Sequence, residues 1–345
     1  MFFWIQGGGL DLTKSNQFDA IENLGEAGFA GRHLVLGEVS AIDAIVAELG
    51  LSRKALAYFR SVKAKYAQVA AIKRIIPKVN VSASCLIATK TDEWIVPLDS
   101  FRTDDAVERA LIIVEHMYDF RVIEGLSRTS LREAGISGWV NISLMPVSGG
   151  GGGTSLTLSV HQQNTRSLGI CVVDSDRMHV KSSLGSTAKG CLNVYQSRWG
   201  WGLHIIGGRE LENLVPPEIF LAGGINFKLS ERGCYREETW AIHGYADTKK
   251  GDCLCRFRAI DIGDLSHKET AAALASIPPV KNNVGCPSNQ CVLCEADGNA
   301  LSTLALKIDA HPIASLRKLP SSVAALSLLL KEVVAFGAAP KWSMI

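Results

Sequence analysis

The sequence has no apolar run long enough to span a membrane. Its longest apolar stretch, Val323–Pro340, is interrupted by Lys331 and Glu332 and predicts an amphipathic helix instead. The first residues, MFFWIQGGG, lack the basic start and the long apolar core of a secretory signal. We therefore expect a cytoplasmic protein that does not act on membranes.

An excess of charge of either sign is also missing. The chain has 345 residues, of which 36 are Lys or Arg and 34 are Asp or Glu, so the formal net charge is +2. Contact with nucleic acid would therefore depend on a local patch rather than on bulk attraction. The apolar fraction of 47% excludes a disordered chain. The nine cysteines are odd in number and not spaced as a disulfide framework, which favours a reducing compartment.

Several catalytic motifs are absent. The glycine run Gly149–Gly153 has no lysine before its Ser/Thr, so it is not a nucleotide phosphate loop, and we interpret it as a flexible turn beside a site. No H-E-x-x-H motif is present, which argues against a zinc hydrolase. The order of residues in Cys291–His311 is only loosely similar to an HNH nuclease, without the Asp-His pair. Nothing marks Tyr118 or Tyr195 as a covalent nucleophile, which disfavours a topoisomerase.

The pattern of the chain divides it into three regions. We predict a mostly helical N-terminal region with two short strands at 1–108. Strands alternate with helical segments over 109–228, which indicates an α/β unit with a mainly parallel sheet. The region 229–345 is smaller, contains a cysteine cluster and ends in the amphipathic helix.

Acidic residues follow two of the predicted buried strands. Glu115 comes directly after Ala110–Val114, and Asp174 and Asp176 come directly after Leu168–Val173. Because ligands bind at the carboxyl ends of parallel strands, these acids are candidates for one pocket. Carboxylates crowded together favour a hard divalent cation such as Mg²⁺. The alternative is that they are ordinary loop residues in water.

Four segments in this order resemble a TOPRIM domain of the nuclease type, including the overcoming-lysogenization-defect group. They are IIVEHMYDFRVIEGLSR (Ile112–Arg128), NISLMPVSGGGGG (Asn141–Gly153), CVVDSDR (Cys171–Arg177) and HIIGGRELENLVPPEIF (His204–Phe220). The resemblance covers about residues 109–225 and implies a TOPRIM-like, mainly parallel sheet with helices on both faces. It departs from the family at His116, where many members have glycine.

The resemblance also implies roles for the acids. Glu115, Asp174 and Asp176 would be the ligands of Mg²⁺ or Mn²⁺, and Glu210 or Glu212 would add a ligand or orient water. Residues two apart on a helix point about 200° away from each other, so we expect only one of these two glutamates to face the metal. Such a site would cleave phosphodiester bonds by metal-assisted hydrolysis.

Basic residues near the predicted acids are candidates for contacts to the scissile phosphate. They are Arg177, Lys181 and Lys189, and for each of them a solvated surface charge is the alternative.

By resemblance, the leading hypothesis is a Mg²⁺-dependent nuclease of DNA or RNA that serves as the toxic effector of a prokaryotic antiviral defence system. The flanking regions would then bind a regulatory protein partner or a second copy of the chain. The alternative is a non-catalytic TOPRIM scaffold that binds nucleic acid in a repair or recombination complex. A complete set of acids favours the hydrolase.

The spacing C-x4-C-x2-C at Cys286, Cys291 and Cys294 resembles half of a structural zinc site. A fourth ligand would come from Cys253, Cys255 or His243. Reduced structural cysteines are the alternative interpretation.

Overall fold

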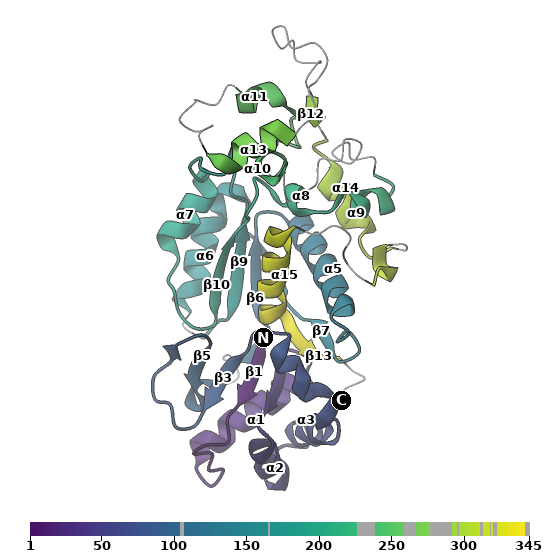
Figure 1. The fold of residues 1–345 in the computed structure, drawn as a ribbon. Coiled ribbons are helices and arrows are strands. Elements are labelled where there is room, and N and C mark those ends of the chain that lie inside the picture. The colour runs from purple at the N-terminus through teal and green to yellow at the C-terminus, as the bar shows by residue number, and fades with distance from the viewer. Residues whose placement is uncertain are drawn as a thin grey trace.

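The structure is a computed structural model. It describes residues 1–103, 107–164, 166–225, 239–258, 267–276, 292–294, 297–310, 313–317, 319 and 323–341. Two α/β units lie one beyond the other, and shorter helices gather at the far end of the second unit (Figure 1). Among the described residues no helix has the length and apolar content needed to cross a bilayer.

The first unit is built on a five-stranded sheet in the order β2-β1-β3-β5-β4. The first four strands in this order are parallel, and the short β4 is antiparallel to β5 at the edge. The strands are β1 (Phe2–Ile5), β2 (Leu34–Gly37), β3 (Val79–Ser82), β4 (Thr89–Lys90) and β5 (Trp94–Pro97). All residues of β1 and β2 are buried, as expected for a parallel sheet covered by helices.

The expectation of a mostly helical N-terminal region with two strands missed β1 and β2. Val35 fits the three- and four-residue spacing of the following helix, but it lies in β2, and the helix begins only at Val39. A buried four-residue strand has no period of its own, so its apolar residues merge with the pattern of the next helix.

Helices connect and cover this first sheet. They are α1 (Ser15–Phe29), α2 (Val39–Ala47), α3 (Arg53–Ala64), α4 (Tyr66–Val69), and the 3-10 helices η1 (Ala70–Arg74) and η2 (Leu98–Phe101). Helices α1 and α3 pack closely because Gly25 and Gly28 leave room for Ala55, Phe59 and Tyr58. The Tyr58 hydroxyl also exchanges hydrogen bonds with the main chain of Val35, which fixes α3 to β2.

The second unit has a four-stranded, entirely parallel sheet in the order β10-β9-β6-β8. Its strands are β6 (Leu111–Val114), β8 (Met145–Ser148), β9 (Gly169–Val173) and β10 (Trp201–Ile205). The chain is therefore an α/β protein with a mostly parallel sheet, as predicted. If the acids after these strands share one pocket, the strands before Glu115 and Asp174 should be parallel neighbours, and they are.

Alternate residues of β6 supply the two faces of this sheet. Leu111 and Ile113 pack with α6 (Thr154–Gln163) and α7 (Ser186–Val194), whereas Ile112 and Val114 belong to the larger core with α5 (Met117–Glu133) and α15 (Ala324–Gly337). Figure 1 shows α6 and α7 on one side of the strands and α5 and α15 on the other. The strands are apolar on both faces because helices cover both.

Two segments that their sequence predicts as single elements are divided in the structure. The pattern of residues 139–146 predicts one strand, but β7 (Val140–Ile142) leaves the main sheet and pairs with β13 (Ala338–Pro340). The pattern of residues 209–221 predicts one helix, but the segment forms α8 (Leu211–Leu214) and α9 (Pro217–Ala222). Pro216 and Pro217 separate them, since Val215 before the first proline is extended.

The remaining elements lie beyond the carboxyl edge of the second sheet or beside α5. They are η4 (Gly151–Gly153), α10 (Trp240–His243), β11 (Asp252–Cys253), α11 (Leu254–Arg258), α13 (Lys268–Ser276), β12 (Val292–Cys294), α14 (Ala300–Lys307) and η7 (Ile313–Ser315).

Helix α15 joins the two units. It packs on α5, β7 and β9 of the second unit and also contacts β1 of the first. Its Glu332 carboxylate lies 2.9 Å from Nδ1 of His204, a buried residue of β10. The strand β13 that follows contacts β2 and α1. A segment from the end of the chain thus covers one face of the second sheet and reaches the first.

Candidate metal and active site

Glu115 and Asp174 lie side by side where β6 and β9 end. The Asp174 main-chain N–H donates a hydrogen bond to Glu115 Oε1, with a distance of 3.0 Å. Asp174 Oδ1 in turn accepts a hydrogen bond of 2.9 Å from the Leu211 N–H at the start of α8. The parallel register of the two strands brings these acids together, as the sequence predicted.

Asp176 belongs to the same edge and has an unusual backbone. Its φ of +52° is the only positive φ of a non-glycine residue in the described part of the chain. The loop is held in place because the Asp176 N–H donates to the Arg209 carbonyl and the Ser175 hydroxyl donates to the Gly208 carbonyl. A left-handed backbone conformation is unfavourable for aspartate, so the surrounding hydrogen bonds must hold Asp176 in this conformation.

Gly185 supports this loop from the other side. An added Cβ there would overlap the Asp176 side chain, although the Gly185 backbone angles (φ −64°, ψ 171°) suit any residue. If Asp176 holds a metal, Gly185→Ala should lower metal-dependent cleavage about tenfold or more, because the added methyl overlaps both the Cβ and the carboxylate of Asp176 and displaces the whole side chain. Gly138→Ala, which meets no atom within 4 Å and lies outside the glycine run, is the matched control for cleavage rate. Equal rates in both variants would contradict a role for Asp176.

Both Glu210 and Glu212 point to the same place. One carboxylate oxygen of each lies 3.6 Å from Nζ of Lys249, and a carboxylate oxygen of Asp174 lies 4.0 Å from it. The prediction that only one of the two glutamates faces inward is wrong for this arrangement. Glu210 is the extended N-cap residue of α8 (φ −138°, ψ 165°) and not part of the helix, so the helical angle between the two residues does not apply.

We define the acid cluster as the group formed by Glu115, Asp119, Asp174, Asp176, Glu210, Glu212 and Lys249. Two of its members, Asp119 and Lys249, were not among the candidates predicted from the sequence. Asp119 lies in the first turn of α5, and its carboxylate accepts a hydrogen bond of 2.9 Å from the His116 N–H. Its position four residues after Glu115 could have indicated it. Lys249 had no signal, since it lies in a polar turn far along the chain.

Burial raises the pKa of five carboxyl groups in the acid cluster. It is the main cause for Glu115, Asp119, Asp174 and Glu212, and it raises the pKa of Glu210 to about 7. Neighbouring carboxylates add to the effect, as Glu212 does for Asp174. Burial acts to lower the pKa of Lys249, but the carboxylates around it raise that pKa overall. The cluster therefore favours a bound cation.

The side chains present fit a divalent ion in one respect. Glu210 Oε2 and Glu212 Oε2 are buried and have no hydrogen-bond partner, so two oxygen ligands of the type that Mg²⁺ prefers are available. Within the described ranges, no three His, Cys, Asp or Glu side chains stand ready as a metal-binding group. Instead Lys249 lies among the acids, and a metal would require their side chains to rearrange around it.

The glycine run positions Glu115. The Gly149 and Gly150 N–H groups donate to the carbonyls of Val114 and Glu115, at 2.7 and 3.1 Å. Gly150 and Gly151 have positive φ, and the Thr154 side chain occupies the space that a Cβ on Gly149 would need. The structure therefore supports the interpretation of the glycine run as a turn beside the site. Its first two N–H groups bind the main chain at Val114 and Glu115.

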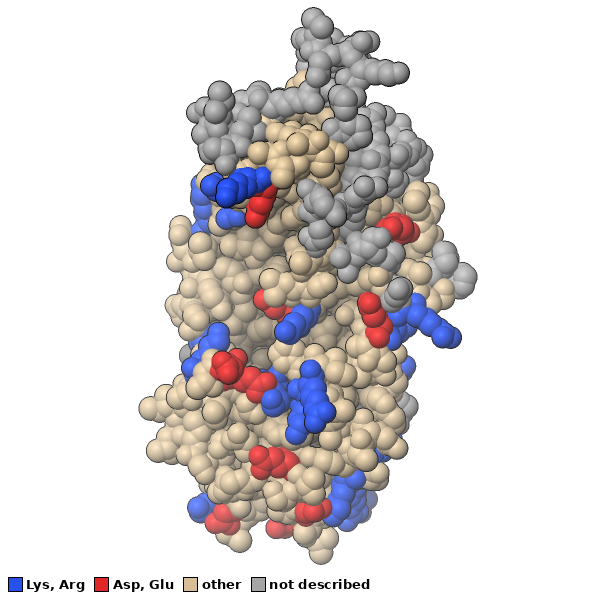
Figure 2. All heavy atoms as spheres, viewed as in Figure 1, with Lys and Arg blue, Asp and Glu red and all other residues tan. Residues whose placement is uncertain are grey.

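The three candidate phosphate contacts differ in their surroundings. The Arg177 guanidinium donates to the Val180 carbonyl at 3.3 Å, within its own loop. Lys181 and Lys189 are exposed. On the face shown in Figure 2, basic and acidic side chains are interspersed among large uncharged areas, in keeping with the near-neutral total. These residues remain candidates.

The predicted zinc ligands Cys286 and Cys291 lie outside the described residues. The backbone of Cys294 lies in β12, which pairs antiparallel with β11. Cys294 is paired with Asp252, the residue that precedes Cys253 in the chain. His243 is buried with both ring nitrogens unpartnered, and burial lowers its pKa to about 4. The zinc site stays a prediction.

Comparison of the chain with models of protein families, with curated proteins and with solved structures found no match.

Proposed function

We propose that the chain is a Mg²⁺-dependent nuclease that cleaves phosphodiester bonds of DNA or RNA at the acid cluster. The observation that supports this most is the convergence of Glu115, Asp174, Glu210 and Glu212 at one carboxyl edge, with two buried carboxylate oxygens that have no partner. A structural ion pair does not need so many acids around one lysine. Divalent-metal sites commonly gather such carboxylates.

The residues suggest a division of roles. Glu115, Asp174 and Asp176 would hold the ion, and Glu210 and Glu212 would complete its coordination or orient water. The ion, when bound, would activate a water molecule and neutralise charge on the phosphate. With a pKa near 7, Glu210 can take up a proton at neutral pH, as a general base requires. Lys249 is placed to pair with a phosphate oxygen once the acids hold a metal.

By its resemblance to stand-alone TOPRIM nucleases, the chain would be the toxic effector of an antiviral defence system. Its activity would then be restrained by a regulatory protein or by self-association. The cytoplasm is the corresponding location.

A second candidate, a non-catalytic nucleic-acid-binding scaffold, is favoured by one specific observation. Lys249 already compensates three of the carboxylates without a metal. In that case the acid cluster would be a structural ion-pair network.

Incubation of the purified protein with plasmid DNA, single-stranded DNA and total RNA distinguishes the two functions. Parallel reactions contain Mg²⁺, Mn²⁺ or EDTA. Cleavage of any substrate that EDTA abolishes supports the nuclease. Binding without cleavage in all metal conditions supports the scaffold.

The raised pKa of Glu210 gives a prediction on pH. Between its ordinary pKa of 4.5 and its folded pKa of about 7, the folded state holds a proton that the unfolded chain releases. Stability in EDTA should therefore fall by about 2–3 kcal/mol as the pH rises through this window. Mg²⁺ competes with this proton, so its stabilising effect should grow over the same window.

Melting temperatures from pH 5 to 8, with EDTA and with Mg²⁺, test this prediction. Glu210→Gln should remove about 2–3 kcal/mol from the fall in stability over this window in EDTA, while the other buried groups keep their own titration. Glu108→Gln, at an exposed residue of the first unit, should leave the wild-type curve unchanged. Identical curves for the wild type and Glu210→Gln would show that Glu210 does not carry a raised pKa.

A further inference from the structure

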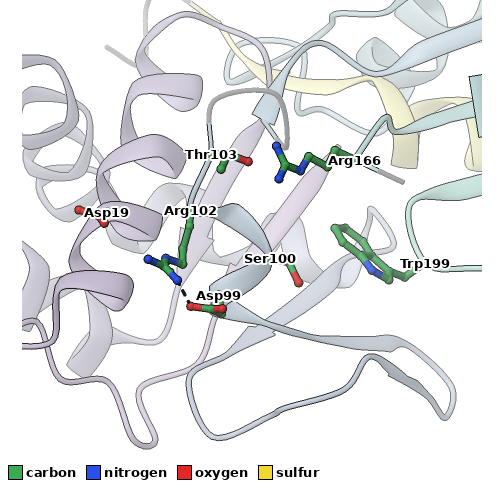
Figure 3. Close-up of a pocket in the computed structure, with 7 residues that line it drawn as sticks. All are labelled: Asp19, Asp99, Ser100, Arg102, Thr103, Arg166 and Trp199. Carbon is green, nitrogen blue, oxygen red and sulfur yellow. Dashed lines mark ion pairs between the residues drawn. The ribbon is translucent and has the colours of Figure 1, made fainter. Parts of the chain in front are cut away.

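A second candidate site lies between the two units. It is a cavity of about 570 Å³, a size typical of small-molecule sites. Its described lining, drawn in Figure 3, comprises Asp19, Asp99, Ser100, Arg102 and Thr103 from the first unit and Arg166 and Trp199 from the second. Arg166 and Trp199 precede β9 and β10, whereas the acid cluster follows the strands. The cavity is therefore at the opposite edge of the second sheet.

The cavity also has a defined place in the first unit. Asp99 and Ser100 belong to η2, which directly follows β5, a strand parallel to β3 and β1. Ligands of parallel α/β sheets bind outside the carboxyl ends of the strands. This edge of the first sheet faces Arg166 and Trp199 across the cavity (Figure 3).

The charges of the lining suit a phosphate on one side. The Asp99 carboxylate is compensated within its own wall, because it accepts a hydrogen bond of 3.0 Å from Asn16 Nδ2 and lies 3.7 Å from Arg102 Nε. Figure 3 shows Arg166 extending from the facing unit toward Thr103. Guanidinium and hydroxyl groups are common donors to phosphate oxygens, and Arg166, Ser100 and Thr103 all line the cavity.

Trp199 provides an aromatic wall. Its ring packs edge to face on Phe101, with centroids 5.7 Å apart at 60°, and Phe101 is fully buried. The indole is half-buried, and it lines the cavity beyond this contact (Figure 3). An indole held firmly in place in this way can stack with a planar base.

We propose that this cavity binds a mononucleotide, with its base against Trp199 and its phosphate held by Arg166 and the hydroxyls of Ser100 and Thr103. The Asp19 carboxylate is the acceptor for ribose hydroxyls. The cavity is lined by both the Trp199 indole and the Arg166 guanidinium, which favours a nucleotide over a simple anion. This proposal does not depend on the nuclease function.

Calorimetric titration of the full chain tests the proposal. The wild-type protein is titrated in EDTA, and the probes are AMP, GMP, CMP and UMP, which contain no phosphodiester bond. Inorganic phosphate and the corresponding nucleosides are titrated separately. At least one mononucleotide should bind about tenfold or more tightly than inorganic phosphate and than its own nucleoside. Binding of phosphate as tight as that of every nucleotide would overturn the role of Trp199 and with it the proposal.

Variants then locate the binding. Arg166→Gln should weaken nucleotide binding about tenfold or more, and Trp199→Phe should weaken it less than Trp199→Ala. Arg60→Gln, at an exposed residue of α3, is the matched control and should bind as the parent does. Should Trp199→Ala fail to fold, Arg166→Gln alone decides. Dissociation constants above about 1 mM for all four nucleotides, or binding unchanged in Arg166→Gln, would overturn the proposal.

Discussion

Replacement of Glu115 or Asp174 by alanine is expected to lower metal-dependent cleavage by at least about a hundredfold. Both carboxylates belong to the acid cluster at the ends of neighbouring strands, and each would be a direct ligand of the ion. Glu115→Gln should have a similar effect on cleavage and a smaller effect on folding, because its remaining oxygen can accept the hydrogen bond from the Asp174 N–H. Initial rates on the best substrate measure the loss.

Asp92→Ala, which removes an exposed acid from a turn of the first unit, should retain the wild-type rate. Circular dichroism and melting curves establish that the variants are folded. If both folded alanine variants cleaved at the wild-type rate, the acid cluster would not be the active site.

Lys249→Met is expected to have the second large effect, on stability. Its ammonium lies within 4.0 Å of three carboxylates, and its loss leaves their buried charges without a counter-ion. Solvent screens this half-exposed lysine, so we expect a loss of about 1–2 kcal/mol in EDTA, or about 2–6 °C in melting temperature. Mg²⁺ should raise the melting temperature of this variant more than that of the wild type, because the ion supplies the missing positive charge.

Lys63→Met is the matched control, since Lys63 pairs with Asp43 at 2.7 Å on an exposed surface. It should change the melting temperature little in either condition. A Lys249→Met protein that is destabilised but gains nothing from Mg²⁺ would favour the scaffold over the nuclease.

Part of the second sheet was predictable because two of its strands, β6 and β9, are short apolar runs followed directly by acids. The runs before Glu115 and Asp174 have no polar position, which marks a strand buried on both faces, and the turns after them are polar. The neighbouring positions of β6 and β9 then followed from the rule that such acids meet at one edge, whereas the positions of β8 and β10 were not predicted. Local sequence and the direction of the strands are enough to predict that Glu115 and Asp174 meet at one edge of the sheet.

The parts that were missed depend on contacts between distant residues. Lys249 joins the acids through tertiary packing, and nothing around it in the sequence distinguishes it from a surface lysine. The orientation of Glu210 depends on where α8 begins, and a shift of one residue takes it off the helix. In the first unit, the Phe2–Ile5 strand is as short and apolar as β6, but Gln6 and three glycines follow it instead of an acid, so the same rule did not find it.

The position of α15 has a consequence for synthesis of the protein. Residues 324–337 cover one face of a sheet whose strands end at residue 205, so more than a hundred residues must leave the ribosome before that face is closed. During this interval the apolar side chains of β6 and β9 are open to water or to a chaperone. His204 likewise lacks Glu332 until then. The fold around the acid cluster is therefore completed late in translation, and a prematurely terminated chain would be a substrate for proteolysis rather than a smaller folded protein.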